Sequence, residues 1–314
     1  MKATAARLVE HGKPLEVTEI DLPEPGPGEV VVDMLYGGVN PVDTYRAAGR
    51  VNPDAPLPRT LGAEGSGTVD GRTVVVTGHG VGTSRDGIWA TKAVVPRSAL
   101  TDVPPGVDPK DAAVMGVAGV TAWRTVTELG EVTADDRVLV LGASGGVGSV
   151  VVSLAHGIGA RVWGQAGSPD SADWIRGLGA ERVLTGGADD LAAQAAQLQP
   201  TAVFDPLGGA FTGAAIEAMA PHGRLVIFGT SAGASGTVSL QALYRSGLRI
   251  VGYAGLLSTD EALSAALAAA LQGLAEKRFE VVVGSVVPLG AVDEAFSQLA
   301  SRKVRGKLVL DLRG

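Results

Sequence analysis

The chain has 314 residues, of which 46% are hydrophobic and 19% charged, a composition that excludes disordered and fibrous proteins. Its length favours two domains or one large one. The formal net charge of −7 argues against a surface that binds nucleic acid or anionic membrane lipid.

The first part of the chain carries short β-branched runs that proline and glycine interrupt, a pattern typical of an antiparallel, barrel-like unit. We expect loops at residues 22–28 and 52–58, where proline is frequent. The predicted strands are Leu15–Ile20, Glu29–Leu35, Thr73–Thr77 and Ile88–Val95.

From residue 111 the pattern changes to alternating helices and strands, which predicts an α/β unit. Asp111–Leu129 and Asp260–Lys277 are expected to be largely helical. A helix over Val292–Ala300 and a strand over Lys307–Leu312 follow, and that strand could rejoin the first unit. The strands predicted between the long helices are Val138–Leu141, Ala160–Gly164, Val183-Leu184, Ala202–Asp205, Arg224–Phe228 and Leu248–Tyr253.

A glycine-rich turn, within the sequence VLVLGASGGVGS at residues 138–149, follows the first of these strands. Gly145 would let the backbone approach a phosphate, and Gly148 would let the next helix pack closely on the strand. Free N–H groups at the start of that helix suit an anion. The segment therefore predicts a dinucleotide site formed by Gly142, Ala143, Ser144, Gly145, Gly146, Val147 and Gly148.

Further cofactor contacts are expected after other strands, because ligands of doubly wound sheets lie beyond the carboxyl ends of the strands. Gly208 follows one predicted strand, and Phe228 and Gly229 end another. Gly167 and Ser168 follow the second strand, where an NAD-selective enzyme places an acidic residue, and none is present. This absence favours NADPH, with NADH as the alternative.

The sequence contains no cysteine, which excludes disulfides, thiolate nucleophiles and cysteine zinc sites. The histidines lack metal-binding spacing, so we expect no metal: they are His11, His79, His156 and His222. The N-terminus lacks the features of a signal peptide, and no apolar run approaches the ~20 residues that cross a bilayer. We therefore expect a cytoplasmic protein without a membrane partner.

Six segments in order resemble the zinc-free quinone oxidoreductase branch of the medium-chain dehydrogenase/reductase superfamily. The resemblance covers almost the whole chain and implies a GroES-like β-barrel domain, residues 1–115 with 285–314, interrupted by a Rossmann dinucleotide-binding domain, residues 116–284. The segments are PGPGEV at 25–30, GVNPVDTY at 38–45, LGAEGSG at 61–67, GVTAW at 119–123, the glycine turn, and RGKLVL at 305–310.

The resemblance also implies roles for individual residues. Asn40, Asp43 and Tyr45 would be catalytic: Asn40 would orient the nicotinamide or the acceptor, and Tyr45 would donate a hydrogen bond or a proton to the substrate. Asn40, Thr121 and Lys307 would contact the cofactor. From the residues alone, Asn40 and Asp43 are equally well explained as turn formers, and Tyr45 as a packed aromatic.

Zinc-dependent relatives carry a cysteine where Asn40 stands and a histidine where Ala63 stands, so the resemblance implies chemistry without a metal. An α,β-unsaturated carbonyl can accept hydride and spread the charge over its own oxygen, and a few hydrogen-bond donors then suffice. We expect NADPH-dependent reduction of quinones or other enones. The alternatives are an enoyl thioester reductase and a non-catalytic NADPH-binding protein.

The strand near 248–253 is expected at a sheet edge and predicts a homodimer.

Overall fold

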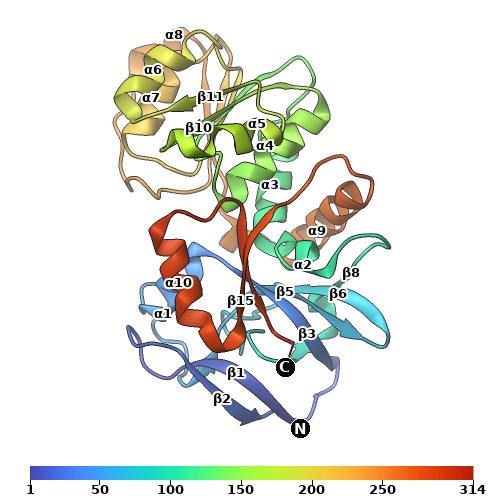
Figure 1. Cartoon of the computed structure of the whole chain (residues 1–314). Coiled ribbons are helices and arrows are strands. Elements are labelled where there is room, and N and C mark those ends of the chain that lie inside the picture. Colours follow the sequence, from blue (N-terminus) through green and yellow to red (C-terminus); the bar gives the residue numbers. More distant parts are fainter. Residues whose placement is uncertain (314) are drawn as a thin grey trace. The chain divides into compact units, whose positions relative to one another are not determined.

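The computed structural model describes residues 1–313, which form two compact units (Figure 1). Unit 1 contains Met1–Val120, Thr259–Glu276 and the segment that starts at Val282. Unit 2 contains Thr121–Ser258 and Lys277–Val281.

Unit 1 is mainly antiparallel β-structure. Its larger sheet has the order β15-β16-β3-β5-β6-β8, with β7 paired to β3, and a smaller sheet has the order β2-β1-β4. The strands are β1 (Lys2–Leu8), β2 (Glu16–Asp21), β3 (Glu29–Val39), β4 (Arg59–Thr60), β5 (Glu64–Val69), β6 (Arg72–Thr77), β7 (Lys92–Pro96), β8 (Leu100–Asp102), β15 (Val283–Pro288) and β16 (Lys307–Asp311).

The core of unit 1 combines buried strand residues with buried residues of two helices, such as Ala47, Val292 and Ala295. The centre of β6 is a run of valines, and Val74, Val75 and Val76 are fully buried. β16 pairs antiparallel with β3, so the last strand does belong to the same sheet as the first long one. The helices are α1 (Pro41–Ala47), α2 (Pro109–Ala112), α9 (Asp260–Ala275) and α10 (Val292–Ser301), with short turns η1 (Arg97–Ala99), η2 (Met115–Gly119) and η6 (Leu289–Ala291).

Unit 2 contains a parallel sheet with the order β11-β10-β9-β12-β13-β14. This is the strand order of doubly wound dinucleotide-binding sheets, in which the order reverses between the first and fourth strands. Here those strands are β9 and β12. The strands are β9 (Arg137–Val140), β10 (Arg161–Ala166), β11 (Arg182–Thr185), β12 (Ala202–Asp205), β13 (Arg224–Ile227) and β14 (Arg249–Gly252).

Helices connect these parallel strands, as βαβ crossovers require. The connecting elements are α4 (Gly146–Ile158), η4 (Pro169–Ser171), α5 (Ala172–Gly177), α6 (Ala188–Ala195), α7 (Ala210–Ala218) and α8 (Leu240–Arg245). α3 (Val120–Arg124) and η3 (Thr125–Leu129) precede the sheet in the chain, and η5 (Gly255–Leu257) follows it. Together the two units confirm the predicted fold class, an antiparallel barrel-like domain with a doubly wound α/β domain.

Two predicted elements differ from the structure. The strand expected at Ile88–Val95 begins only at Lys92, because the N–H groups of Ile88 and Trp89 bond to the carbonyls of Gly62 and Leu61 instead. The helix expected over 111–129 is interrupted by two π-helical turns, η2 and η3.

The helix expected at Asp260–Lys277 forms as α9, and the contacts of the chain place it in unit 1. The resemblance instead implies that these residues belong to the dinucleotide-binding domain. Asp260 shows why they group with unit 1: its carboxylate accepts a hydrogen bond from the backbone N–H of His79 at 2.7 Å. Within residues 1–313, no helix is both long and apolar enough to cross a membrane.

Candidate active site

The segment that begins α1 is shaped by proline. Asn40 precedes Pro41 and has an extended backbone (φ −128°, ψ 155°), as expected for a residue before proline. Pro41 then occupies the first turn of the helix, where its missing N–H costs nothing. The Asp43 carboxylate accepts from the backbone N–H of Asn40 at 2.9 Å and so closes the turn.

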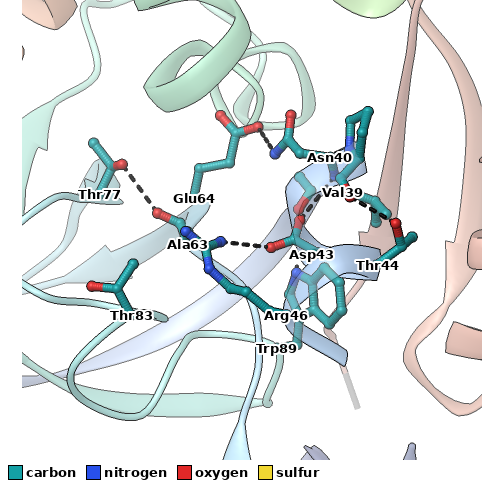
Figure 2. Close-up of polar contacts among 12 residues, drawn as sticks. Val39, Asn40, Asp43, Thr44, Arg46, Ala63, Glu64, Thr77, Thr83 and Trp89 are labelled. Atoms are coloured by element: carbon teal, nitrogen blue, oxygen red, sulfur yellow. Dashed lines mark hydrogen bonds and ion pairs between the residues drawn. The ribbon is translucent and has the colours of Figure 1, made fainter. Parts of the chain in front are cut away.

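Asp43 and Arg46 form a buried ion pair on α1. Arg46 Nη1 donates to Asp43 Oδ1 at 3.1 Å, and both side chains are almost fully buried (Figure 2). Burial raises the pKa of the Asp43 carboxyl to about 6, although Arg46 and the Asn40 N–H act in the opposite direction. The nearby Glu64 carboxylate raises this pKa further and Lys307 lowers it.

Sequence reasoning missed Glu64, the first residue of β5, which is fully buried beside Asn40. Its Oε1 accepts from Asn40 Nδ2 at 2.7 Å, as Figure 2 shows, and its Oε2 accepts from the backbone N–H of Val117 in η2 at 2.7 Å. An acidic residue within a glycine-rich strand, EGSGTV, was the signal available in the sequence.

Lys307 completes this group from β16. Its side chain is only 4% exposed, and Nζ donates to Asn40 Oδ1 at 2.6 Å and to Glu64 Oε1 at 3.3 Å. Lys307 was predicted as a cofactor contact, and the structure shows its ammonium group bound inside unit 1. We refer to Asn40, Asp43, Arg46, Glu64 and Lys307 as the polar cluster.

Tyr45 is not brought into the polar cluster. It lies on α1 between Asp43 and Arg46, but it is 42% exposed whereas they are buried. Helical geometry explains the difference, since residues two apart on a helix point in different directions. Its predicted role as a hydrogen-bond or proton donor stays a prediction.

In unit 2 the glycine turn connects β9 to α4 and has the shape of a phosphate cradle. Gly142 has a φ of +58°, and a Cβ at Gly148 would overlap the carbonyl oxygen of Gly142. A Cβ at Gly145 would lie 3.2 Å from the same oxygen. Among the described residues, no side chain caps the N-terminus of α4, so its first N–H groups are available to an anion.

The turn after β12 lies beside this cradle at the point where the strand order reverses. A Cβ at Gly142 would lie 3.2 Å from Pro206 Cγ and 3.3 Å from Leu207 Cδ2. Gly208 lies in this turn with a φ of +68°, and Gly229 is close enough that a Cβ there would lie 2.7 Å from the Pro206 carbonyl oxygen. Phe228 precedes Gly229 and is half-buried. These predicted residues are thus brought together in neighbouring turns at the carboxyl ends of β9, β12 and β13.

Two buried polar residues hold these turns: Gln165, which the sequence did not single out, and Asp205, which ends the strand before Gly208. Gln165 Oε1 accepts from the Gly142 N–H at 3.1 Å, and its Nε2 donates to the Gly186 carbonyl at 3.1 Å. Asp205 Oδ1 accepts from the N–H groups of Leu207 and Gly208 at 2.8 and 2.9 Å. Both bond to backbone groups of the turns, so they fix the shape of the turns.

Thr121, the residue expected near the nicotinamide, lies in α3 of unit 2 beside Tyr253. Burial raises the pKa of the Tyr253 hydroxyl, while its hydrogen bond with Thr121 and the adjacent Arg124 lower it. The Arg124 guanidinium lies 5.6 Å from the centre of the Tyr253 ring. Tyr253 is another polar residue that the sequence did not single out.

Gly167 and Ser168 lie exposed directly after β10. The Ser168 hydroxyl accepts from the backbone N–H of Asp170 at 3.2 Å. Arg176, the basic side chain nearest in sequence after this turn, donates to Asp173 at 2.6 Å. Within residues 1–313, no three His, Asp or Glu side chains are grouped to hold a metal ion.

The comparisons with known proteins agree with this geometry. A family described as alcohol dehydrogenase GroES-like domain matches residues 26–105, and one described as zinc-binding dehydrogenase matches residues 146–272. The barrel-like unit, the doubly wound sheet and the glycine cradle therefore define a nicotinamide-dependent oxidoreductase of the dehydrogenase class. Within that class, the chain belongs to the medium-chain dehydrogenase/reductase superfamily.

Relatives with quinone oxidoreductase names match over nearly the whole length. The quinone oxidoreductase of Pseudomonas aeruginosa is 29% identical, over 98% of this chain and 99% of its own. The quinone oxidoreductase of Thermus thermophilus, solved also with NADPH, is 28% identical with a TM-score of 0.86, over 99% and 100% of the two chains. A solved NAD-dependent alcohol dehydrogenase is 30% identical with a TM-score of 0.88, over 98% and 99%. These matches support NAD(P)H as the cofactor class.

Proposed function

We propose that the protein reduces quinones or other α,β-unsaturated carbonyls with NADPH and without a metal. The observation that carries the proposal is Asn40, a buried amide that bonds to Lys307 and Glu64 where zinc-dependent relatives carry a cysteine. Quinone oxidoreductase names among the full-length relatives support the substrate class.

We propose that the cofactor binds at the turns that follow β9, β12 and β13 in unit 2. The glycine turn leaves space for a diphosphate that side chains would fill, and the uncapped start of α4 offers N–H groups to its charge. Gly208, Phe228 and Gly229 would border the rest of the dinucleotide, with Thr121 beside the nicotinamide. When bound, NADPH supplies the hydride equivalent that a reductase requires.

The residues of unit 1 would supply the polar groups of the reaction. Asn40 would donate a hydrogen bond from Nδ2 to the acceptor oxygen, on which negative charge develops. Tyr45 would donate from its hydroxyl group to the same acceptor. A quinone or enone delocalises this charge over its own conjugated system, so such donors would replace a Lewis acid.

The preference for NADPH over NADH rests on the exposed turn after β10. Gly167 and Ser168 begin this turn, and neither carries the carboxylate that NAD-selective sheets direct at the ribose hydroxyl. Arg176 is paired with Asp173, so we propose that Ser168 and the adjacent backbone contact the 2′-phosphate.

We also propose that the protein is located in the cytoplasm.

The test is a turnover assay with purified protein, NADPH or NADH, and a benzoquinone, a simple enone and a crotonyl thioester in parallel. We expect turnover with quinone or enone, a lower KM for NADPH than for NADH, and no stoichiometric zinc. Chelator should leave the rate unchanged. Tight NADPH binding without turnover of any acceptor would indicate a binding protein, and turnover of the thioester alone would indicate an enoyl thioester reductase. One bound zinc per chain that is needed for activity would also contradict the proposal.

We further propose that the protein is a homodimer formed through β14, which is an edge strand of the parallel sheet. Apolar side chains are exposed on and near this edge: Ile250 on β14, and Leu240 and Tyr244 on α8. An exposed apolar strand edge favours pairing with a second copy about a two-fold axis. Light scattering should give a dimer mass for the wild type and a monomer mass for Ile250→Asp. A monomeric wild type at micromolar concentration would contradict this assignment.

A further inference from the structure

Two ionised groups of the polar cluster have no part in the reaction proposed above. Glu64 and Lys307 are nearly as buried as any residue in unit 1, and both bond to the side chain of Asn40. Burial of a charge is costly unless it is paired and hydrogen-bonded, so such a pair calls for an explanation. Both partners contact the same amide from opposite ends.

We propose that Glu64 and Lys307 are positioning residues that hold the Asn40 amide in a single orientation. The inference rests on the proposed function, because it concerns the residue assigned there as the donor to the acceptor oxygen. Glu64 fixes the Nδ2 end by accepting from it at 2.7 Å, and Lys307 fixes the Oδ1 end by donating to it at 2.6 Å.

The charges of Glu64 and Lys307 select this one orientation of the Asn40 amide. A rotated amide would turn its N–H donors toward the Lys307 ammonium, which has only donors, and its oxygen toward the Glu64 carboxylate, which has only acceptors. Both contacts would then be repulsive. A neutral pair of partners, such as two amides or hydroxyls, could satisfy either orientation and would not select one.

The orientation still leaves Asn40 able to serve a ligand. An amide nitrogen has two N–H donors, and Glu64 accepts from Nδ2 with one oxygen, so one donor remains. A donor whose direction is fixed before the substrate binds stabilises developing charge without reorganisation during the reaction. The two positioning residues would therefore act on the rate through Asn40.

Glu64 is itself held in place from a second side. Its other oxygen accepts from the backbone N–H of Val117 in the π-helical turn η2. The carboxylate thus joins β5, η2 and the start of α1, and Lys307 joins β16 to the same point. Asp43 and Arg46 form a neighbouring buried pair, so the cluster contains two buried anions and two buried cations.

The sequence offers a direct spectroscopic test, because Asn40 and Asn52 are the only two asparagines in the chain. Selective ¹⁵N labelling of asparagine gives signals from two side-chain amide groups, each with two N–H protons, and Asn40→Ala assigns them. Asn52 is exposed and serves as the internal reference. In the wild type we expect the Asn40 amide protons to exchange with solvent far more slowly than those of Asn52.

Lys307→Met removes the ammonium group while keeping an unbranched side chain, and Lys303→Met changes a nearby exposed lysine as a control. Lys307→Met should speed Asn40 amide exchange by about tenfold or more, the factor that corresponds to about 1.36 kcal/mol, while Lys303→Met should not change it. If Lys307→Met does not fold, Glu64→Gln carries the test, since a neutral glutamine replaces the charge-assisted hydrogen bond from Asn40 Nδ2 with a weaker one. Unchanged Asn40 exchange in a folded Lys307→Met or Glu64→Gln protein overturns the proposal.

Turnover separates a positioning role from a general structural one. Lys307→Met should lower kcat in the wild-type background by about tenfold but have little further effect in an Asn40→Ala background, because the two residues act through one group. NADPH affinity, measured by fluorescence titration, should be unchanged in Lys307→Met. Equal losses of kcat in both backgrounds, or a loss of NADPH affinity, overturn the proposal.

The amide-exchange experiment needs no turnover, so the two proposals can fail separately. A protein that reduces no acceptor but shows a slowly exchanging Asn40 amide, released by Lys307→Met, contradicts the proposed function and supports the positioning pair. An active protein in which neither variant changes the Asn40 signals contradicts the positioning pair alone.

Discussion

In unit 2 the candidate cofactor site consists of glycines and backbone N–H groups, whereas in unit 1 the candidate site consists of buried ionised side chains around one amide. The backbone site lies mostly within one stretch of chain, from β9 to the start of α4. The side-chain site joins α1, β5 and β16, which are far apart in the sequence. We therefore expect ligand binding at the backbone site to be lost when an added side chain fills the space at a glycine. We expect function at the side-chain site to be lost when a charge or a hydrogen bond of the polar cluster is removed.

The largest expected effect is at the backbone site. In Gly148→Ala the added Cβ would overlap the Gly142 carbonyl oxygen, so the turn must open and the diphosphate loses its cradle. We expect NADPH affinity to fall by about 100-fold or more, which corresponds to about 2.7 kcal/mol. Gly177→Ala, at a position where no described atom lies within 4 Å of the new Cβ, is the matched control. Fluorescence titration of both folded variants measures the difference, and equal affinities would remove this turn from the site.

Asn40→Ala tests the side-chain site. Removal of a donor that stabilises developing charge lowers kcat by about 100-fold in well-studied cases, and we expect a loss of that order here. NADPH affinity should change little, because the proposed site for the diphosphate lies in unit 2. Asn52→Ala, at the other asparagine, should have wild-type kcat. Steady-state kinetics with a benzoquinone gives the comparison, and a wild-type kcat in Asn40→Ala would exclude the amide from the reaction.

The buried Asp43 makes the stability of unit 1 depend on pH. Burial raises the pKa of its carboxyl from 3.8 to about 6, so the folded state binds this proton more tightly than the unfolded state. Its contribution to the free energy of unfolding is therefore full at low pH and is lost as pH rises through about 6. Between about pH 5 and about pH 7.5 the loss amounts to about 1.4 kcal/mol.

Asp43→Asn removes this titration. Urea denaturation at several pH values should show that the wild type loses about 1.4 kcal/mol relative to Asp43→Asn across that range. Asp54→Asn, at an exposed position in the loop after α1, is the control variant. Parallel pH dependence of wild type and Asp43→Asn would show that the carboxyl does not titrate in this range.

The smallest expected effect is at Tyr45, which is exposed and lies outside the polar cluster. With a quinone, Tyr45→Phe should lower kcat/KM through one lost hydrogen bond, worth about 0.5–1.5 kcal/mol. Tyr244→Phe, another exposed tyrosine, is the control. A loss of ~10²–10⁴-fold with a crotonyl thioester would instead identify Tyr45 as a general acid. Such a loss with quinone would show that the acceptor cannot carry its charge unaided.

The contrast between the units also explains what the sequence could predict. Gly142, Gly145 and Gly148 are neighbours in the chain, and their spacing between an apolar strand and a helix was enough to predict a phosphate turn whose shape the structure reproduces. The parallel strands could be predicted because each is a short apolar run. Their order in the sheet could not be predicted from these runs, because it depends on how the crossover connections pack.

Glu64 could not be predicted in the same way. Its partners Asn40, Val117 and Lys307 are brought to it by sheet register and by a π-helical turn, and neither leaves a periodic signal in the sequence. The sequence predicted a largely helical segment over 111–129, but it gave no signal for the two π-helical turns that the structure has there. Conversely, Asn40 and Asp43 were selected by resemblance, and their burial and partners became visible only in three dimensions.

The pairing of β16 with β3 has a consequence for how the protein is made on the ribosome. β3 and α1 emerge early, but the lysine that completes their polar cluster lies on a strand synthesised after the whole of unit 2. Domains generally fold as units during synthesis, so the parallel sheet can form before β16 has been synthesised and has paired with β3. Until Lys307 has been synthesised, Glu64 lacks the cation that pairs with it in the folded protein. The backbone of β3 that later pairs with β16 is then open to pairing with other chains. Nascent chains that stall before this strand should therefore be the ones that chaperones retain.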